Sequence, residues 1–464
     1  MKSLCIKIKL LLVLAVAVLF ASCSKEGPEL SPQEKVLQRV CRFVYDYTSE
    51  AYLWNANIPQ GVTYKSAADP YQLFEILRYK ELDRWSALSD NADEQMDEFE
   101  GVSTTFGYSL AFGRFSNKPQ EMFAVVEFVY EDSPARKAGI KRGDLILSLG
   151  GAPITELNYT NLYYAPQVEI GLGHVNLHGM VIDSGVKCTL TAVNMYEDPV
   201  IETLVLEEGG KKTGYVAYAG FYERSHERLV QVFRDFESAG VSELILDLRY
   251  NLGGDAKTPS YLASLFAPAR NVKGKSVFLR QQWNDAYTEY FTKQGEDLNT
   301  YFAADIPVNL NLQRVYILTS SKTASASEAV ISGLKPYMDV VLVGGKTYGK
   351  YCGAALLTPD SQQNADISNW MLTLVVYKFV NAEGFTDFKN GIPADHEVED
   401  SGLLAGIPLG SKEDPLVAKA LSLICGDGTK VAHEPLHLPE GISIDPSFGL
   451  REEKGGYKMV MDLK

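Results

Sequence analysis

The sequence is poor in basic residues, in cysteine and in histidine, and these shortages exclude several classes of protein. Among 464 residues, 44 Lys and Arg stand against 59 Asp and Glu, giving a formal net charge of −15. An acidic chain without a dense basic cluster is poorly suited to binding a phosphate backbone, so we expect no nucleic-acid partner. The hydrophobic fraction of 46% is too low for a protein with many membrane spans, yet 26 Tyr and 20 Phe can fill several hydrophobic cores.

The cysteines and histidines show no spacing typical of a disulfide framework or a metal site. Four cysteines are widely separated, and we interpret them as buried apolar side chains: Cys41, Cys188, Cys352 and Cys425. The six histidines have no ligand spacing, and no His-Glu-x-x-His zinc motif is present. We therefore expect neither a metal nor another cofactor.

The first residues have the pattern of a secretory signal peptide. Three lysines precede an eleven-residue apolar run, Leu10 to Phe20, which is too short to span a bilayer. The run ends in Phe20-Ala21-Ser22-Cys23, which resembles the lipobox of bacterial lipoproteins, with Phe in place of the usual Leu. The resemblance implies that residues 1–22 are removed and that Cys23 is lipidated, followed by a tether at 23–30. The alternative is ordinary cleavage with Cys23 as a bystander.

Helical signals dominate the next segment. Ser31-Pro32-Gln33-Glu34 predicts a helix start, and apolar residues recur at helical spacing from Val36 to Ala51. A second helix is predicted from Asp69-Pro70. We therefore expect a helical region at 31–100, then domains at 101–195 and 196–428, and a C-terminal extension at 429–464.

The second segment resembles the PDZ domains of bacterial proteases. Strands are predicted at 106–112 and 122–129, followed by Ser133-Pro134-Ala135 and then Ala138-Gly139-Ile140-Lys141-Arg142-Gly143-Asp144. A PDZ domain adds an extended peptide to a sheet edge and holds its terminal carboxylate with backbone N–H groups. The candidate peptide-binding residues are Phe106, Gly107, Tyr108, Ser109 and Leu110. A purely structural PDZ module is the alternative, and the aromatic insertion at 158–184 is unexplained.

From about residue 196 the predicted elements alternate. Strands are expected at 213–219, 244–248, 315–318 and 340–343, with helices at 224–239, 258–266 and 326–337. An apolar strand is expected at 367–381. Such alternation is typical of βαβ units, so we predict a multi-domain α/β protein whose catalytic part has a mostly parallel sheet.

Three loops follow predicted buried strands and carry small or nucleophilic residues. The segments are 247–254, which ends in Asn251-Leu252-Gly253-Gly254, then 319–328 around Ser325, then 344–350 ending in Lys350. A hydroxyl at a helix start lies close to free N–H groups that would stabilise an oxyanion.

Two other motifs in this region are incomplete. Gly344-x4-Gly349-Lys350 lacks the Ser or Thr that completes a phosphate-binding loop, because Tyr351 follows. Ser332-Gly333-Leu334-Lys335 matches the Ser-x-x-Lys pattern of penicillin-recognising enzymes, but the partner Lys-Thr-Gly is missing. Neither motif predicts a function here.

Together, the three loops resemble the carboxyl-terminal processing peptidases, or tail-specific proteases, and the lipoprotein start resembles their Bacteroidetes members. In that family a Ser-Ala-Ser-Glu motif is followed, 25 residues after its first Ser, by the catalytic Lys, and Lys350 follows Ser325 at that spacing. The 247–254 and 391–395 segments also match, and the resemblance covers roughly 101–425. It implies a ClpP/crotonase-like fold for the catalytic domain. Two positions depart from the family: Tyr351 replaces Gly, and Ala354 replaces a Gln that orients the amine.

The resemblance implies a Ser325/Lys350 dyad acting through an acyl-enzyme. Burial disfavours the lysine ammonium, which would let Lys350 accept the serine proton. The backbone N–H groups of Ala326 and of Gly253 or Gly254 would form the oxyanion hole. Should another base act instead, His226 and His396 are the candidates.

The expected function is therefore a serine endopeptidase that binds protein or peptide substrates through its PDZ domain. The lipid anchor would place it in the cell envelope, attached to the outer membrane and either periplasmic or surface-exposed; the oligomeric state is left open. Two alternatives are a catalytically impaired peptide-binding lipoprotein, favoured by Ala354, and a glycan-binding surface lipoprotein that uses the 158–184 aromatics.

Overall fold

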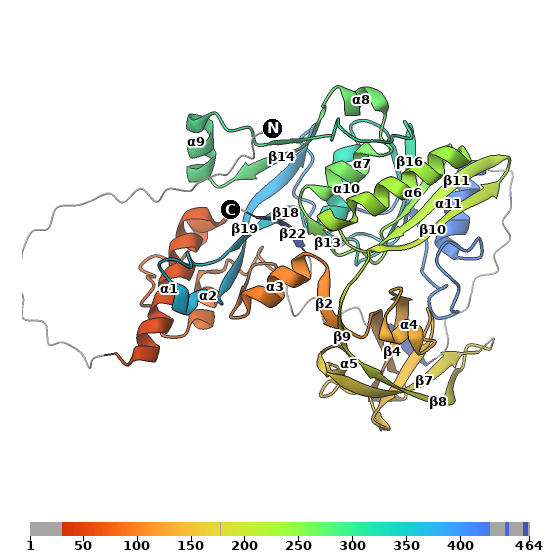
Figure 1. Ribbon diagram of the computed structural model, residues 1–464, viewed down its shortest axis with the longest axis horizontal. Helices are drawn as coiled ribbons and strands as arrows, with labels where there is room; N and C mark the ends of the chain where they lie inside the picture. The colour runs from red at the N-terminus through yellow and green to blue at the C-terminus, as the bar shows by residue number, and fades with distance from the viewer. Residues whose placement is uncertain (1–29, 177, 427–440, 445–457, 463–464) are drawn as a thin grey trace, which may run out of the picture.

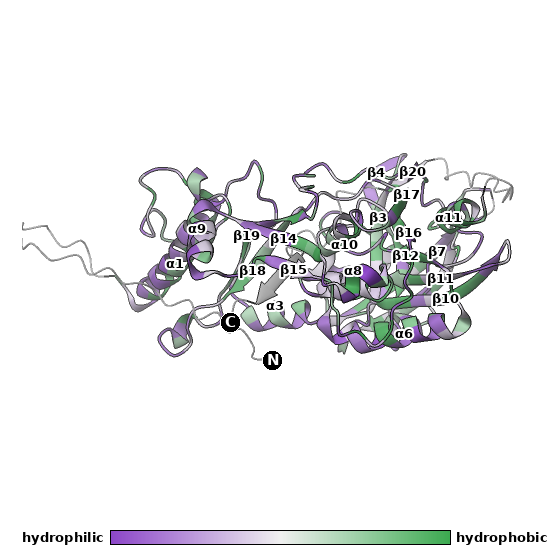
Figure 2. Ribbon diagram, turned by 90° about the horizontal axis from the view of Figure 1, so that it is seen from above, coloured by the Kyte–Doolittle hydropathy of each residue, from purple (hydrophilic) through white to green (hydrophobic). Residues whose placement is uncertain are grey.

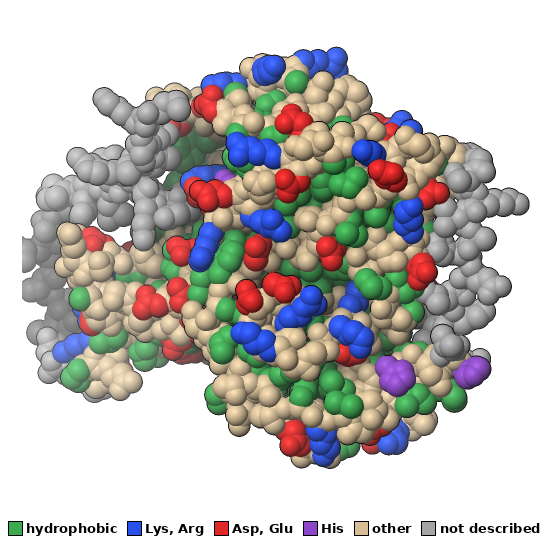
Figure 3. Space-filling model, turned by 45° about the vertical axis from the view of Figure 1, so that its right-hand side comes forward, with side chains coloured by type: hydrophobic (Ala, Val, Ile, Leu, Met, Phe, Trp, Pro, Cys, Tyr) green, Lys and Arg blue, Asp and Glu red, His purple; other side chains and the backbone are tan. Residues whose placement is uncertain are grey.

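The computed structural model describes residues 30–176, 178–426, 441–444 and 458–462 (Figure 1). The expected signal peptide and Cys23 lie outside these residues. Within the described residues, no helix is both long and apolar enough to cross a membrane. On the face drawn in Figure 3, acidic and basic side chains are interspersed.

The N-terminal region is helical, as its sequence predicts. Ser31 caps the first helix: its hydroxyl accepts the Glu34 N–H at 3.3 Å, and the Glu34 carboxylate accepts the Ser31 N–H at 2.7 Å. Asp69 caps the second. The helices are α1 (Pro32–Ala51), α2 (Pro70–Leu77) and α3 (Ala92–Phe99), with a short 3-10 turn, η1 (Asn55–Asn57).

These helices share a hydrophobic core with the catalytic domain. Val40 and Leu73 belong to the same buried cluster as Phe233 and Leu374. The Tyr52 carbonyl accepts the side-chain N–H of Asn284 at 3.0 Å. In Figure 1, α1 and α2 lie beside strand β19 (Met371–Asn381). The N-terminal region is therefore part of the catalytic unit rather than a separate appendage.

The PDZ region is a β-sheet with two short helices, as predicted, and lies at the lower right of Figure 1. Ser133 caps the first helix by accepting the Arg136 N–H at 3.0 Å. Gly107 is required at its turn, because its φ is +81° and an added Cβ would lie 2.1 Å from Ser133 Cβ. The elements are β3 (Tyr108–Phe115), β4 (Lys118–Val129), α4 (Pro134–Lys137), β5 (Leu145–Leu149), β6 (Ala152–Pro153), α5 (Asn161–Tyr164), β7 (Gln167–Val175) and β8 (Val181–Thr191).

Two further features complete this region. Strands β2 (Val102–Thr105) and β9 (Val193–Tyr196) pair where the chain enters and leaves it. The aromatic insertion supplies α5 and β7, and several of its rings pack inward. Tyr159 is buried against Phe112, and the Tyr108 hydroxyl donates to the Leu162 carbonyl at 2.8 Å. These rings therefore build the PDZ core, a role the sequence did not indicate.

The predicted parallel sheet is present in the catalytic domain. Its order is β10-β11-β12-β16-β17-β20, and every pair except β10–β11 is parallel. Figure 2 shows its central strands as hydrophobic and α6 with a hydrophilic outer side. The strands are β10 (Val200–Glu208), β11 (Lys211–Tyr218), β12 (Glu243–Asp247), β16 (Arg314–Thr319), β17 (Asp339–Gly344) and β20 (His396–Glu397). The helices of the domain are α6 (His226–Ala239), α7 (Thr258–Ser264), α8 (Ala269–Lys273), α9 (Asp285–Gln294), α10 (Ala326–Leu334) and α11 (Pro415–Cys425), with the 3-10 turns η2 (Glu223–Ser225) and η3 (Ala365–Ile367).

A second sheet, which the sequence pattern did not reveal, lies against the same core. Its order is β13-β22-β18-β19-β14-β15, with β1 paired to β19. Apart from β19, its strands are β1 (Ala87–Ser89), β13 (Gly253–Asp255), β14 (Val277–Trp283), β15 (Asn299–Tyr301), β18 (Cys352–Leu357) and β22 (Lys458–Asp462). The N-terminal region and the C-terminal extension therefore each contribute a strand to it, and β21 (Ile442–Ile444) pairs with the PDZ strand β3.

Candidate active site

Ser325 occupies a strained position between β16 and α10. Its φ of 60° is rare for a residue with a side chain, and such strain is commonly retained at functional sites. The loop that carries it is fixed to the 247–254 segment. The Thr323 hydroxyl donates to the Leu248 carbonyl at 2.9 Å, and the Ala324 N–H donates to the Asn251 carbonyl at 3.1 Å.

The Ser325 side chain is fully buried, and within the described residues its Oγ has no hydrogen-bond partner. The hydroxyl is therefore not hydrogen-bonded to the Lys350 amine in this structure. Catalytic hydrogen bonds often tighten only when substrate is bound.

Lys350 lies just before β18 and is also buried, with 1% of its surface exposed. Its Nζ lies 5.8 Å from the centroid of the Trp85 ring, which belongs to the N-terminal region. Gly349 permits this path, because its φ is +101° and an added Cβ would lie 2.6 Å from the Gly391 nitrogen.

Glu328, on the first turn of α10, connects the two candidate catalytic residues. Its Oε2 accepts the backbone N–H groups of Ser325 and Lys350, each at 2.8 Å. Its Oε1 accepts the Thr347 hydroxyl and the Gly349 N–H, each at 2.6 Å. Burial raises the pKa of this carboxyl to about 7, although the four donors act in the opposite direction.

The sequence singled out Glu328 only as part of the motif, and no role for it or for Thr347 was predicted. A buried acid three residues after Ser325, at a helix start, is a signal that could have found it. The loop resembling a phosphate-binding loop thus gives two of its N–H groups to a carboxylate of the protein itself.

The three predicted oxyanion donors differ in the hydrogen bonding of their backbone N–H groups in this structure. Ala326 begins α10, where backbone N–H groups have no partner inside the helix. The Gly253 N–H, in contrast, donates to Asn251 Oδ1 at 2.8 Å, so it is already engaged. Gly254 tolerates no side chain, because an added Cβ would lie 2.1 Å from the Phe221 carbonyl oxygen. Gly254, whose N–H is not bonded to Asn251, pairs with residue 459 of β22.

A cavity of about 920 Å³ lies between α3, the PDZ region and the catalytic loops. Leu252, Gly253 and Gly254 line its catalytic end. Of the predicted peptide-binding residues, Tyr108, Ser109 and Leu110 line it, whereas Phe106 and Gly107 do not. Phe106 is instead buried in the PDZ core, and the Gly107 N–H donates to Thr105 Oγ1 at 3.0 Å.

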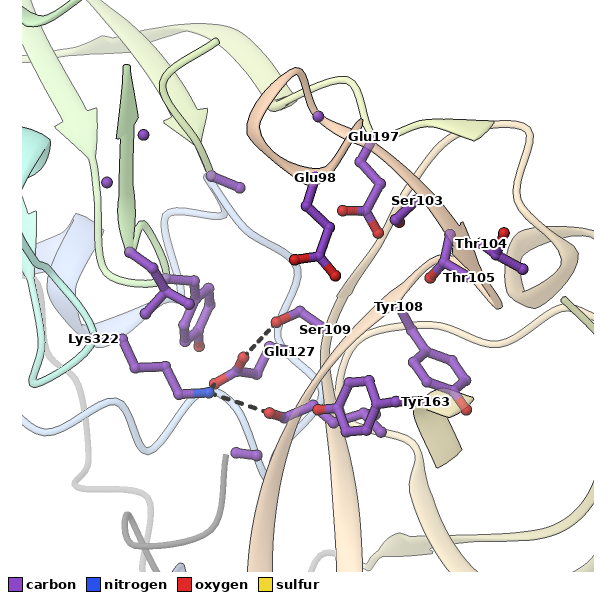
Figure 4. Close-up of a pocket in the computed structure, with 18 of the residues that line it drawn as sticks. Glu98, Ser103, Thr104, Thr105, Tyr108, Ser109, Glu127, Tyr163, Glu197 and Lys322 are labelled. Carbon is purple, nitrogen blue, oxygen red and sulfur yellow. Dashed lines mark hydrogen bonds and ion pairs between the residues drawn. The ribbon is translucent and has the colours of Figure 1, made fainter. Parts of the chain in front are cut away.

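Lys322, three residues before Ser325, reaches from the catalytic loop into the PDZ region (Figure 4). Its Nζ donates to Glu127 Oε1 at 2.7 Å and to the Leu110 carbonyl at 3.2 Å. Glu127 is nearly fully buried and also accepts the Ser109 hydroxyl at 2.8 Å. The cavity wall that holds Ser109 and Leu110 is thus attached directly to the loop that carries Ser325.

A buried ion network makes a second connection between the domains. Arg142, in the PDZ region, donates to Asp400 Oδ1 at 3.0 Å, and Arg249 donates to the same oxygen at 3.0 Å. Arg249 also bonds Asp414 through both of its terminal nitrogens, at 2.8 and 3.1 Å. Burial raises the pKa of Asp400, but the two guanidinium groups outweigh burial and hold the pKa below its ordinary value.

The structure also locates the other residues that the sequence analysis named. His226 is half-buried: its ring stacks on Tyr261 with centroids 3.8 Å apart, and its Nε2 hydrogen-bonds Thr258 Oγ1 at 3.0 Å. Tyr351 is buried against Trp85, with ring centroids 6.2 Å apart, and Ala354 is buried in β18. Among the described residues, no group of three His, Cys, Asp or Glu side chains could hold a metal ion.

Comparisons with known proteins agree with this architecture. Residues 212–398 match peptidase family S41, residues 39–87 match the peptidase S41 N-terminal domain, and residues 125–163 match a PDZ domain. A carboxyl-terminal-processing protease of Synechocystis is 27% identical over 66% of this chain and 66% of its own length. The carboxy-terminal processing protease CtpB of Bacillus subtilis is 25% identical over 82% of this chain and 68% of its own.

This chain thus spans about two thirds of the length of these relatives. Among solved structures, one from Bacteroides fragilis, described as a candidate S41 protease, has a TM-score of 0.69 and 25% identity. It covers 87% of this chain and 100% of that one. Family matches, curated relatives and fold coincide, and the chain belongs to peptidase family S41, with an N-terminal helical region and a PDZ domain ahead of its catalytic domain.

Proposed function

We propose that this protein is a serine endopeptidase in which Ser325 is the nucleophile and Lys350 the general base. The observation that carries the proposal is the common attachment of both residues to Glu328 Oε2. Because both N–H groups donate to the same oxygen at 2.8 Å, the two backbone nitrogens lie no more than twice 2.8 Å apart. They lie at the N-terminus of α10, and the N–H groups at such a helix end stabilise an oxyanion.

The reaction would proceed in two steps. Ser325 Oγ forms a bond to the peptide carbonyl carbon while its proton moves to Lys350 Nζ; the peptide C–N bond then breaks as that proton passes to the departing amine nitrogen. Water, deprotonated by Lys350 Nζ, attacks the carbonyl carbon of the resulting ester, the bond to Ser325 Oγ breaks, and Lys350 returns the proton to that oxygen. The Ala326 N–H, with that of Gly254, would bind the oxyanion, and one such donor contributes roughly 3–4 kcal/mol to the transition state.

Substrates would be recruited along the PDZ side of the cavity. Tyr108, Ser109 and Leu110 line this wall and belong to β3, so a C-terminal or unfolded segment of a protein could bind there in an extended conformation. The cavity continues to Leu252 and Gly254, which would lead the bound segment towards the nucleophile.

We further propose that Cys23 carries a lipid and anchors the protein in the cell envelope, at the outer membrane. The support is the Phe20-Ala21-Ser22-Cys23 sequence after the apolar run.

Cleavage of an unfolded protein by purified variants tests the proposed function. Ser325→Ala should abolish cleavage and leave the fold intact, because it removes one oxygen without a hydrogen bond. Ser327→Ala is the matched control: this hydroxyl donates to the Asn251 carbonyl at 3.1 Å, so its loss should reduce stability moderately without abolishing activity. Activity that survives Ser325→Ala and disappears with Ser327→Ala would contradict the assignment.

One observation favours the alternative of an impaired peptide-binding lipoprotein. Position 354, where the family has an orienting Gln, is a buried Ala, and the Ser325 hydroxyl lacks a hydrogen bond. If this alternative holds, the protein will bind extended peptides but cleave none, with wild type and Ser325→Ala indistinguishable.

A further inference from the structure

Strand β22, from the C-terminal extension, lies inside the second sheet between β13 and β18 (Figure 1). It runs parallel to both neighbours. Residues 458–460 pair with Gly253–Asp255, and residues 460–462 pair with Ala354–Leu356. These five residues are therefore bound by strand addition on both sides, which is how an extended peptide binds a protein through main-chain hydrogen bonds.

The two neighbouring strands adjoin the segments that carry the candidate catalytic residues. Strand β13 contains Gly253 and Gly254 and begins two residues after Asn251, whose carbonyl accepts the Ala324 N–H next to the nucleophile. Strand β18 begins two residues after Lys350. The β22 segment thus lies between the strand with the candidate oxyanion donors and the strand that follows the candidate base.

The state of the nucleophile agrees with an occupied cleft. Ser325 has no exposed surface, and its Oγ has no hydrogen-bond partner within the described residues. A serine nucleophile must be reached by a peptide carbonyl, so Ser325 must become accessible before a substrate can react. Lys350, with 1% exposure, is equally covered.

The same extension also covers part of the PDZ strand that lines the cavity. Strand β21 pairs antiparallel with the far end of β3, with Ile442 opposite Phe115 and Ile444 opposite Gly113. Ile444 itself lines the cavity. The C-terminal extension therefore pairs with β3 at the edge of the PDZ sheet and fills an interior position of the second sheet.

We propose that Lys458–Asp462 is a built-in peptide ligand of the catalytic cleft, which occupies the position of an extended peptide substrate and slows the cleavage of other substrates until it is displaced. The inference rests on the proposed function in taking this cleft as catalytic, but the binding itself requires no catalysis. A tethered segment has an effective local concentration in the millimolar range, so free substrates compete poorly with it.

A binding experiment tests the proposal without relying on activity. The probe is a fluorescent peptide with the sequence of residues 458–464, added to Ser325→Ala protein that is either full-length or ends at residue 457. Fluorescence anisotropy should show binding to the shortened protein and at least tenfold weaker binding to the full-length protein. A peptide of the same composition in scrambled order is the control. Equal binding to both proteins, or no specific binding to the shortened one, would overturn the proposal.

Point variants address the same question in the intact chain. Val460→Pro, in the middle of β22, removes a backbone N–H and is incompatible with a central strand, whereas Val460→Ala keeps the backbone donor. With Ser325 intact, the proline variant should cleave an unfolded protein at least tenfold faster than wild type, and the alanine variant should lie much closer to wild type. The free 458–464 peptide should inhibit the proline variant.

The competing account is that β22 is a permanent strand of the sheet. It predicts that Val460→Pro loses cooperative unfolding without any gain in rate, and that outcome would overturn our proposal. Failure of the proposed function gives a different result: cleavage would be unaffected by Ser325→Ala, while the anisotropy experiment would still decide whether the cleft binds the segment.

Discussion

Ser325 and Lys350 donate their backbone N–H groups to one oxygen atom, Glu328 Oε2, at 2.8 Å each. The oxygen belongs to a fully buried carboxyl group on the helix that Ser325 precedes. A displacement of α10 therefore moves both residues together. The chain between them forms α10 and β17, and the Glu328 side chain joins its two ends directly.

Glu328→Gln should lower the rate of peptide cleavage by roughly 10–100-fold, because an amide N–H₂ would face two N–H donors and shift the loops.

The same variant should also change the dependence of the cleavage rate on pH. The pKa of Glu328 is raised to about 7 by burial, and its four donors all require an acceptor, so protonation below that pH disrupts the site. Wild-type kcat/KM should fall as the pH drops through about 7 and Glu328 becomes protonated. The variant has no carboxyl group at this position and should lack this fall; identical pH profiles would contradict this.

Stability should show the opposite dependence at this residue. The folded pKa of about 7 lies above the ordinary value of 4.5, so between these pH values the folded protein holds a proton that the unfolded chain releases. The stabilising contribution of Glu328 is thus complete below pH 4.5 and is lost as the pH rises through about 7. The difference in free energy of unfolding between wild type and Glu328→Gln, measured by urea titration from pH 4.5 to 8, should follow this course.

Lys350→Arg should be almost as damaging as Lys350→Ala, with a loss of at least roughly 100-fold in kcat. Arginine keeps the positive charge and most of the length, but it cannot release its proton at accessible pH. Stopped assays on an unfolded protein measure both variants. If the arginine variant stays active, Lys350 is not the base, and the search for one begins again.

Lys322→Met should destabilise the protein by roughly 2–4 kcal/mol, because it leaves the buried Glu127 carboxylate without its cation. Adding Glu127→Gln should recover most of this loss. The control is Lys293→Met, which removes an exposed i,i+4 pair with Glu289 and should change stability by less than about 0.5 kcal/mol. Urea unfolding measures wild type, the three single variants and the double variant; additive effects of Lys322→Met and Glu127→Gln would show that the two residues act independently.

Cys23→Ala should release the protein from membranes into the soluble fraction, since we propose the acylated thiol as its anchor. Fractionation of cells with immunodetection measures the distribution, and Cys41→Ala, at a buried cysteine of α1, is the matched control. Equal membrane association of Cys23→Ala and wild type would rule out the lipid anchor.

Much of the fold was predictable because its signals are local. Caps such as Ser31 and Ser133 mark helix starts within a few residues, and alternating apolar runs indicate βαβ units. The candidate catalytic residues could be named from motif spacing, since a fixed number of residues separates Ser325 from Lys350.

Contacts between distant segments were not predictable in this way. The attachment of Lys322 to Glu127 joins residues 195 positions apart, and no local pattern encodes it. The insertion of β22 between β13 and β18 is a choice of partner strand, which depends on a sheet edge formed elsewhere in the chain. The engagement of the Gly253 N–H by Asn251 likewise depends on a turn geometry that the glycine pair alone does not fix.

The most direct test of the central claim is to identify the residue that reacts with a fluorophosphonate, by peptide mass mapping of the purified protein. Our account predicts one adduct, on Ser325, that is absent from Ser325→Ala and retained in Ser327→Ala. An adduct on another serine, or labelling that persists unchanged in Ser325→Ala, would contradict it.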